Sequence, residues 1–153
     1  MSSPSDKLFC TVLTDASWCP HEKVAGWACW IVCNDERYKR FDAFFEKVDT
    51  PVEAEIKAIL NGLFIARRVF NADRYHVVSD CTQAMAALKG EWPTDKWKLK
   101  LLDIIGSASV SYKHVKAHTK ATDKRSWVNN WCDFNAKIAM RSMRTIPRGK
   151  QGG

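Results

Sequence analysis

Four acidic residues in this chain are candidates for metal chemistry. Asp15, Glu55, Asp80 and Asp133 are each flanked by apolar residues, so we expect each carboxylate to be half-buried. An unpaired carboxylate away from water is unfavourable, and four of them brought together would need cations. Carboxylate oxygens suit magnesium or manganese rather than zinc. The four residues therefore predict a site for divalent cations.

Three of these residues also have structural interpretations. Asp15 could cap a turn, where aspartate is common, and Asp80 could be the N-cap of a following short helix. Glu55 competes with Glu53, because the two lie on opposite edges of the apolar stripe of one predicted helix and periodicity does not choose between them. A capping box that starts at Thr50 gives Glu53 a structural role, which favours Glu55 as the candidate ligand.

Asp133 lies in a segment that predicts a helix with two apolar stripes. A charge between two buried stripes is unusual unless it binds something, so we interpret Asp133 as functional. The first predicted stripe contains Trp127, Trp131, Phe134 and Ile138, and the second contains Cys132, Ala136 and Ala139.

The first half of the chain predicts three strands and a long helix. Runs of β-branched and apolar residues predict strands at 8–14, 25–32 and 38–45. Their short connections favour an antiparallel meander. The helix begins with Thr50 at the N-cap and Pro51 at the first helical position.

The second half predicts alternating strands and helices, with Asp80 at the end of a strand and Asp133 inside the last helix. Three antiparallel strands followed by β-α units imply an α/β fold, with a mixed five-stranded sheet and helices on both faces. We expect strands at 75–79 and 110–115, helices at 82–88, 97–105 and about 126–143, and a loop at 90–95.

The length and net charge of the chain are those of a single basic domain. The chain has 153 residues and a formal net charge of +7. This charge suggests an anionic partner, such as nucleic acid or an acidic membrane surface. We expect a domain at residues 8–144, between loose ends at 1–7 and 145–153.

The N-terminal sequence and the cysteines indicate in which cellular compartment the protein is expected. The sequence shows no apolar signal segment and no stretch long enough to span a membrane, so we expect a cytoplasmic protein without a membrane partner. An intracellular chain keeps its thiols reduced, and the lack of a C-x-x-C pair argues against zinc. Most of the six cysteines are predicted to be buried apolar residues: Cys10, Cys19, Cys29, Cys33, Cys81 and Cys132.

Five short motifs occur in a fixed order along the predicted elements. They are T-D-A-S at 14–17, A-E-I at 54–56, S-D-C at 79–81, V-K-A-H at 115–118 and N-N-W-C-D-F-N-A at 129–136. This order resembles that of the type 1 ribonucleases H, over nearly the whole predicted domain. Each motif is short, but five motifs on the expected elements make the resemblance specific.

The resemblance implies an endonuclease that hydrolyses the RNA strand of an RNA–DNA hybrid with two divalent ions, Mg²⁺ or Mn²⁺. Two metal ions about 4 Å apart can activate a water and stabilise the leaving oxygen without a protein nucleophile. By the resemblance, Asp15, Glu55 and Asp80 would hold the ions. Asp133 would hold only one ion, and His118 would be a mobile residue that helps proton transfer or product departure. We expect a monomer.

The chain departs from this family in the parts that grip substrate. The Asn pair that usually contacts the RNA 2′-hydroxyls is replaced by Pro51 and Val52. The family's long basic handle is missing, so the chain resembles a compact form. An aromatic ring with lysines nearby can stack on sugars and meet phosphates. We expect Trp97 in the core and a structural role for His114. The predicted substrate-binding residues are Ser17, Thr50, Trp92, Lys98, Lys100 and Lys116.

Two other functions stay open on the sequence. A metal-dependent DNA nuclease or a resolvase of the same fold would also use clustered carboxylates. The V-K-A-H motif and the Cys132-Asp133 pair favour a ribonuclease H over these enzymes. An inactive nucleic-acid-binding module is disfavoured, because four buried acids without a function would destabilise it.

Overall fold

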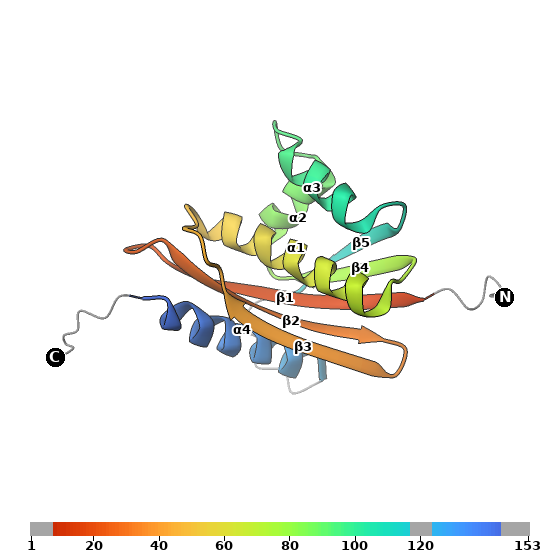
Figure 1. Cartoon of the computed structure of the whole chain (residues 1–153), viewed down its shortest axis with the longest axis horizontal. Helices are drawn as coiled ribbons and strands as arrows, with labels where there is room; N and C mark the ends of the chain where they lie inside the picture. The colour runs from red at the N-terminus through yellow and green to blue at the C-terminus, as the bar shows by residue number, and fades with distance from the viewer. Residues whose placement is uncertain (1–7, 117–123, 145–153) are drawn as a thin grey trace.

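The computed structural model describes residues 8–116 and 124–144, which form one mixed sheet with helices on both sides (Figure 1). The order of elements is the predicted one: three strands, a helix, a strand, two helices, a strand and a helix. Within these two ranges, no helix combines the length and the apolar character needed to cross a membrane. The elements are β1 (Phe9–Cys19), β2 (Val24–Cys33), β3 (Glu36–Ala43), α1 (Pro51–Phe70), β4 (Arg74–Ser79), α2 (Thr82–Lys89), α3 (Lys96–Ile105), β5 (Ser109–His114) and α4 (Lys124–Ser142).

The five strands lie in the order β3-β2-β1-β4-β5. β2 pairs antiparallel with both β1 and β3 across short turns, whereas β4 pairs parallel with both β1 and β5. Parallel strands need long crossover connections, which the helices between β3 and β5 supply. The predicted α/β fold with a mixed five-stranded sheet is therefore confirmed.

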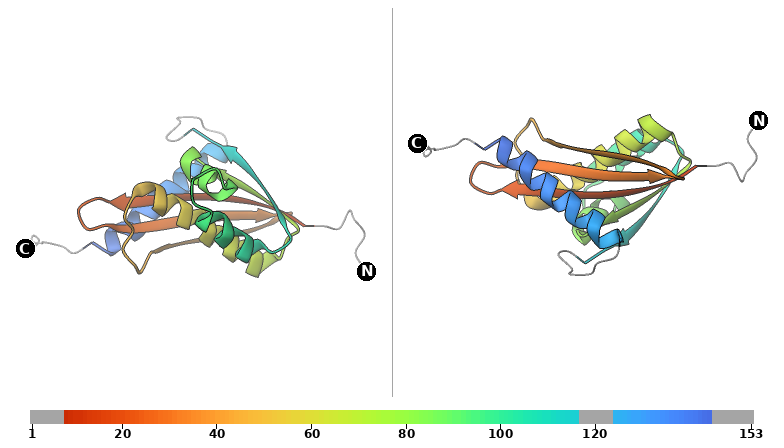
Figure 2. Two further views of the ribbon diagram at one scale, coloured as in Figure 1. Left: turned by 90° about the horizontal axis from the view of Figure 1, so that it is seen from above. Right: turned by 90° about the horizontal axis from the view of Figure 1, so that it is seen from below.

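Two layers of helices enclose the sheet. α1, α2 and α3 lie on one face, and α4 crosses the other face alone (Figure 1, Figure 2). The larger core lies under α1, where Ile56, Ile59 and Leu63 are fully buried. A smaller core lies under α4 and contains Cys132 and Ala136. Each of the six cysteines is a free thiol and five of them are buried, as predicted for most of them.

β1 is longer than predicted, which moves Asp15 from the end of a strand to its interior. β1 pairs with β2 as far as Cys19 opposite Val24. Its pairing with β4 ends much earlier, at Leu13 opposite Val78. The predicted end of the first strand at Thr14 is wrong, because the antiparallel partner continues past the point where the parallel partner leaves.

The N-terminus of α1 is capped as predicted. The Thr50 hydroxyl accepts a hydrogen bond from the Glu53 amide at 3.0 Å, and Pro51 begins the helix. The Glu53 carboxylate accepts from the Asp49 amide at 3.3 Å, one residue before the amide that a regular capping box uses. The cap decides where α1 starts, and so which turn of the helix carries Glu55.

α4 buries only one of its two predicted apolar stripes. The small residues Cys132, Ala136 and Ala139 are buried against the sheet. The prediction that the aromatic stripe is also buried is wrong, because the helix approaches the sheet too closely for large side chains. In the aromatic stripe Trp127 is 57% exposed, Phe134 62% and Ile138 40%.

Gly26 on β2 makes the close approach of α4 possible. A Cβ atom added at this residue would overlap the Ala136 carbonyl oxygen and the Met140 amide nitrogen. Both are backbone atoms of α4, so no side-chain rotation relieves the overlap. Gly26 therefore sets the distance between α4 and the sheet, and with it the position of Asp133.

We expect Gly26→Ala to destabilise the protein, because α4 must move away from the sheet to make room for the methyl group. Overpacking of this kind costs about 1–3 kcal/mol, which a urea titration followed by circular dichroism would measure. Ser17→Ala, at the position opposite Gly26 on β1, is the matched control and should change the free energy of unfolding by roughly 0.5 kcal/mol or less. Equal stability of Gly26→Ala and the parent protein would contradict the close approach.

Candidate metal centre

Three carboxylates from separate parts of the chain meet where β1 and β4 stop pairing. Asp15 lies in β1, Glu55 lies in α1, and Asp80 directly follows β4. Each residue offers one oxygen, and these oxygens all lie within 4.8 Å of one another. The structure thus brings together three of the four carboxylates that the sequence singles out. We call these three residues the acidic cluster.

The register of the parallel strands explains why Asp15 and Asp80 meet. Leu13 and Val78 are the last paired residues of β1 and β4, and each aspartate lies two residues further along the chain. Equal offsets from a parallel pair place the two residues at the same level. Glu55, at the start of the second turn of α1, reaches the same point from the neighbouring helix layer.

Burial and mutual repulsion raise the pKa of two of the three carboxyls. Asp15 is only 3% exposed. Its burial, followed by the charge of Asp80, raises its pKa from an ordinary 3.8 to about 8, although the Ala16 amide donates a hydrogen bond to its Oδ1 at 2.9 Å. Burial, followed by the charges of Asp15 and Asp80, also raises the pKa of Glu55. The three groups therefore resist being ionised together.

The donor atoms of the acidic cluster fit a hard divalent cation. Glu55 Oε1 is buried and has no hydrogen-bond partner, which is unfavourable for a carboxylate oxygen. All three ligands are carboxylates, which suit Mg²⁺, Mn²⁺ or Ca²⁺. The neighbouring Cys81 is not among the residues whose ligand atoms meet there.

Asp133 lies beside the acidic cluster and not inside it. Its charge contributes to the raised pKa of Asp15, after burial and the charge of Asp80. Its oxygens are not among those that lie within 4.8 Å of one another. Instead, Asp133 forms an ion pair with Lys137, one turn further along α4, at 3.1 Å. The fourth predicted carboxylate is therefore engaged by a lysine next to the cluster.

The structural alternatives for Glu55 and Asp80 do not describe their surroundings. Glu53 lies away from the acidic cluster, where it caps α1 and pairs with Lys57 at 3.2 Å. Cys81, and not Asp80, is the N-cap residue of α2, and it makes no side-chain capping hydrogen bond. Glu55 rather than Glu53 faces the two aspartates, which is the choice that the capping box predicts.

Two predicted substrate-binding residues lie on or at the start of elements that carry the acidic cluster, and a third, Lys116, lies beyond β5. Ser17 is half-buried on β1, and Thr50 is exposed at the start of α1, where its hydroxyl accepts the capping hydrogen bond. Lys116 is exposed just beyond β5. It follows Val115, whose amide donates a hydrogen bond to the last residue of β4 at 3.0 Å. The predicted His118 lies outside the described residues.

Trp92 lines a pocket of about 410 Å³ beside α2. The same pocket contains Lys89, Tyr112 and His114. His114 is exposed there, because β5 is the edge strand of the sheet, and its predicted structural role stays a prediction. The Tyr112 hydroxyl is buried and has no hydrogen-bond partner. Sequence reasoning missed Tyr112 and His114 as neighbours of Trp92, although side chains two residues apart on β5 share a face of the sheet.

The two predicted lysines of α3 point in different directions. Lys98 lies against Gly90, since a Cβ atom added to Gly90 would be 2.7 Å from the Lys98 Cδ atom. The Lys100 ammonium group is 6.0 Å from the centroid of the Trp97 ring, and Lys100 lines a depression that also contains Glu46. Trp97 is 6% exposed, so its predicted place in the core is confirmed.

Residues 13–126 match the reverse transcriptase-like family of proteins. No curated protein matches the chain. Among solved structures, the chain is similar to the N-terminal RNase H domain of a Mycobacterium tuberculosis protein fused to maltose-binding protein, with 17% identity and a TM-score of 0.69 over 88% of this chain and 95% of that one. It is also similar to RNase H1 from the halophilic archaeon Halobacterium salinarum, with 18% identity and a TM-score of 0.69 over 88% of this chain and 98% of that one.

We expect divalent cations to stabilise the protein, and to do so more at high pH than at low pH. Because the folded pKa of Asp15 is raised from 3.8 to about 8, its protonated form favours folding, and this contribution is lost as the pH rises through that window. A cation that takes the place of the proton restores the stability, since carboxylate ligands bind metals when deprotonated. The rise in melting temperature on adding Mn²⁺, at about pH 6 and about pH 9, measures the effect.

Asp15→Asn is the control for this pH dependence, because it removes the titrating group and keeps its shape. Without metal, the variant should lose less stability than the parent protein as the pH rises, and Mn²⁺ should raise its melting temperature less. A stabilisation by Mn²⁺ that is equal at both pH values, or equal in the variant and the parent, would contradict a cation site at the acidic cluster.

Proposed function

The chain belongs to the reverse transcriptase-like family and is a type 1 ribonuclease H-like protein, and from this premise we propose that it hydrolyses the RNA strand of RNA–DNA hybrids. One observation carries the proposal: oxygens of Asp15, Glu55 and Asp80 lie within 4.8 Å of one another, and one Glu55 oxygen is buried without a hydrogen-bond partner. Such crowding of negative charge opposes folding. The crowded carboxylates would have a function if they bound cations next to a phosphodiester.

The acidic cluster would hold two Mg²⁺ or Mn²⁺ ions, with Asp133 as a ligand of one of them. When bound, two such ions activate water for attack on the scissile phosphate and stabilise the departing oxygen. The protein's own contribution is to keep Asp15, Glu55 and Asp80 close together against their mutual repulsion. Rigid elements do this better than loops, and β1 and α1 supply two of the three residues.

Asp133 would be the most adaptable of the four ligands. Its partner Lys137 has a side chain that is 43% exposed, so the ion pair is partly solvated and contributes little to stability. Asp133 can therefore exchange Lys137 for a cation at a small cost in free energy. His118, on the segment after β5, would move a proton near the departing group.

Substrate contacts would come from residues around the acidic cluster. A hybrid is recognised through the 2′-hydroxyls of its RNA strand and the backbone of its DNA strand. The predicted contacts are Ser17 on β1 and Thr50 at the N-cap of α1, two elements that carry the cluster, and Lys116 just beyond β5. Trp92 and Lys98 would act together on the DNA strand, since Lys98 lies against Gly90, two residues before Trp92. Lys100 would contribute less, since it lies beside Glu46.

We also propose that residues 8–144 act as one domain and that the protein works as a monomer. The described elements of this range all belong to one sheet and the helices that cover it. The acidic cluster is assembled within a single chain, so the proposed chemistry requires no second copy.

Cleavage of a labelled RNA–DNA hybrid in Mg²⁺ or Mn²⁺ tests the proposed function. Duplex DNA and duplex RNA of the same sequence are the matched substrates. We expect cleavage of the RNA strand of the hybrid only, and only with a divalent cation. Cleavage of duplex DNA instead would indicate a DNA nuclease or resolvase of the same fold. Binding of the hybrid without any cleavage would indicate a nucleic-acid-binding module.

We expect Asp80→Asn and Glu55→Gln to lower hybrid cleavage by on the order of 10²–10³-fold or more, because each removes a charge that acts at the reacting centre. Hybrid binding should survive in both variants. Glu53→Gln is the matched control, since Glu53 lies in the same turns of α1 and pairs with Lys57. It should lower the melting temperature slightly and leave the cleavage rate nearly unchanged. Comparable losses at Glu53 and Glu55 would refute the assignment.

We expect hybrid affinity to depend only weakly on salt, because the sequence has no counterpart of the long basic handle that the resemblance to type 1 ribonucleases H implies. Each phosphate contact adds about 0.9 to the slope of log affinity against log salt. Lys98→Glu should weaken binding and reduce this slope, and Trp92→Ala should weaken binding through lost stacking. Lys100→Glu, which changes the charge equally, should have a smaller effect. The measurement is affinity against salt in Ca²⁺, and unchanged affinity in the Trp92 and Lys98 variants would place the DNA strand elsewhere.

A further inference from the structure

A groove lies on the face of the sheet that α4 crosses. It has a volume of about 730 Å³ and lies between the N-terminal part of α4 and strands β1, β2 and β3. Trp30 from β2, Trp127 from α4, and Arg37 and Lys39 from β3 are among the residues that line it. None of the described residues that line it is acidic. The groove therefore combines aromatic walls with positive charge.

Aromatic rings gather in and beside this groove. Trp127 and Trp131 each meet Trp30 edge to face, with ring centroids 5.3 Å apart, and Phe41 meets Trp131 at 6.1 Å. Trp127 and Phe41 nevertheless remain 57% and 41% exposed. Single exposed apolar residues are common, but a contiguous exposed patch of this kind usually marks a site of interaction.

β3 separates its acidic residues from the side chains that face the groove. Successive side chains of a strand point to opposite faces of the sheet. Arg37 and Lys39 point into the groove, whereas the acidic residues Glu36 and Asp42 occupy the alternate positions on the other face. The Lys39 ammonium group lies 5.0 Å from the centroid of the Trp30 ring. The groove thus places basic side chains next to aromatic rings, and β3 has no acidic side chain on the face that lines the groove.

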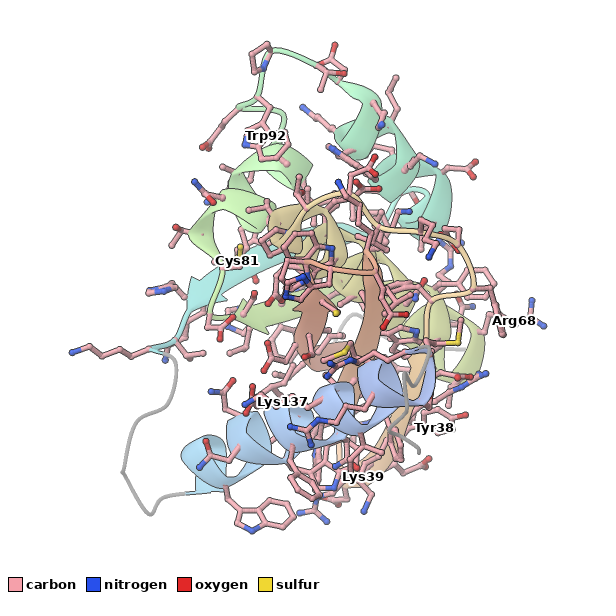
Figure 3. All side chains as sticks on the ribbon, turned by 90° about the vertical axis from the view of Figure 1, so that its left-hand side faces the viewer. Tyr38, Lys39, Arg68, Cys81, Trp92 and Lys137 are labelled. Carbon is pink, nitrogen blue, oxygen red and sulfur yellow. The ribbon has the colours of Figure 1, made fainter. Side chains whose placement is uncertain are left out.

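The groove and the acidic cluster lie on different sides of α4. Trp131, beside the groove, and Asp133, beside the cluster, are two residues apart and so about 200° apart around the helix. Figure 3 shows Lys39 below α4 and Cys81, which directly follows the cluster residue Asp80, above it. The groove is therefore separate from the proposed cleavage site.

We propose that this groove binds an unpaired nucleic-acid strand, whose bases stack on Trp127 and Trp30 and whose phosphates contact Arg37 and Lys39. Proteins that bind single strands combine a basic groove with aromatic side chains on which bases stack. A single nucleic-acid strand offers both flat bases and negatively charged phosphates. A second copy of this chain would not complement the basic groove, because it carries the same net charge of +7. The inference goes beyond the proposed hydrolysis, since it depends on neither the carboxylates nor a metal ion.

Fluorescence anisotropy of a labelled oligothymidylate of about 12 nucleotides, titrated with the protein in EDTA, tests the proposal. EDTA removes the cations that the proposed cleavage requires. Trp127→Ala should weaken binding by about tenfold through lost stacking, and Trp127→Phe should restore most of the affinity. Lys39→Glu should weaken binding and lower the slope of log affinity against log salt by at least about 0.7.

Phe64 and Arg68 on α1 provide the matched control on the opposite face of the sheet. Phe64 is 49% exposed, and the Arg68 guanidinium lies 5.6 Å from the centroid of its ring. Phe64→Ala removes a comparable exposed ring, and Arg68→Glu changes the charge as much as Lys39→Glu does. Both variants should bind the oligonucleotide as the parent protein does.

Three results would overturn the proposal. The parent protein could fail to bind the oligonucleotide, or the Phe64 and Arg68 variants could lose as much affinity as the groove variants, which would indicate general attraction to a basic protein. A polyglutamate peptide could bind in the groove in place of the oligonucleotide, which would assign the groove to an acidic protein partner. The melting temperature of each variant is measured first, and if Trp127→Ala does not fold, Lys39→Glu decides the question.

Discussion

The cost of ionising Asp15, Glu55 and Asp80 side by side, away from water, is the constraint that the rest of the structure must meet. Their oxygens lie within 4.8 Å of one another, and burial strengthens the repulsion because water does not screen it. The large core under α1 offsets this cost. Gly62 lets α1 lie close to β1, since a Cβ atom added there would be only 2.9 Å from Thr14 Cγ2. A helix seated at this distance holds Glu55 beside the two aspartates, and a bound cation would relieve the repulsion.

The contact between α4 and Gly26 positions the side chains on both flanks of the helix. Because Gly26 lets the α4 backbone approach the sheet, only small side chains fit beneath the helix. Large aromatic side chains such as Trp127 are displaced to the flank of α4, where they wall the groove. Asp133 projects on the other side, beside the acidic cluster. One close helix–sheet contact therefore positions a proposed metal ligand and a proposed binding surface together.

The parts of the structure that depend on local sequence could be predicted. The cap at Thr50, the apolar period of α1 and the short turns of the meander are local features, and they led to the correct order of elements and fold class. Glu55 could be chosen over Glu53 for the same reason. The interior position of Asp15 and the exposure of Trp127 could not be predicted in this way. The first depends on how far two different strands pair, and the second on a contact between elements that lie far apart in the sequence.

The acidic cluster is the centre of this account, and the position of bound ions tests it most directly. Crystals soaked in Mn²⁺ and measured for the anomalous scattering of manganese would locate the ions without reference to activity. The account predicts manganese bound by Asp15, Glu55 and Asp80, with the otherwise unpartnered Glu55 Oε1 among the ligand atoms. Manganese bound only at other carboxylates, with these three residues free of metal at saturating concentration, would contradict it.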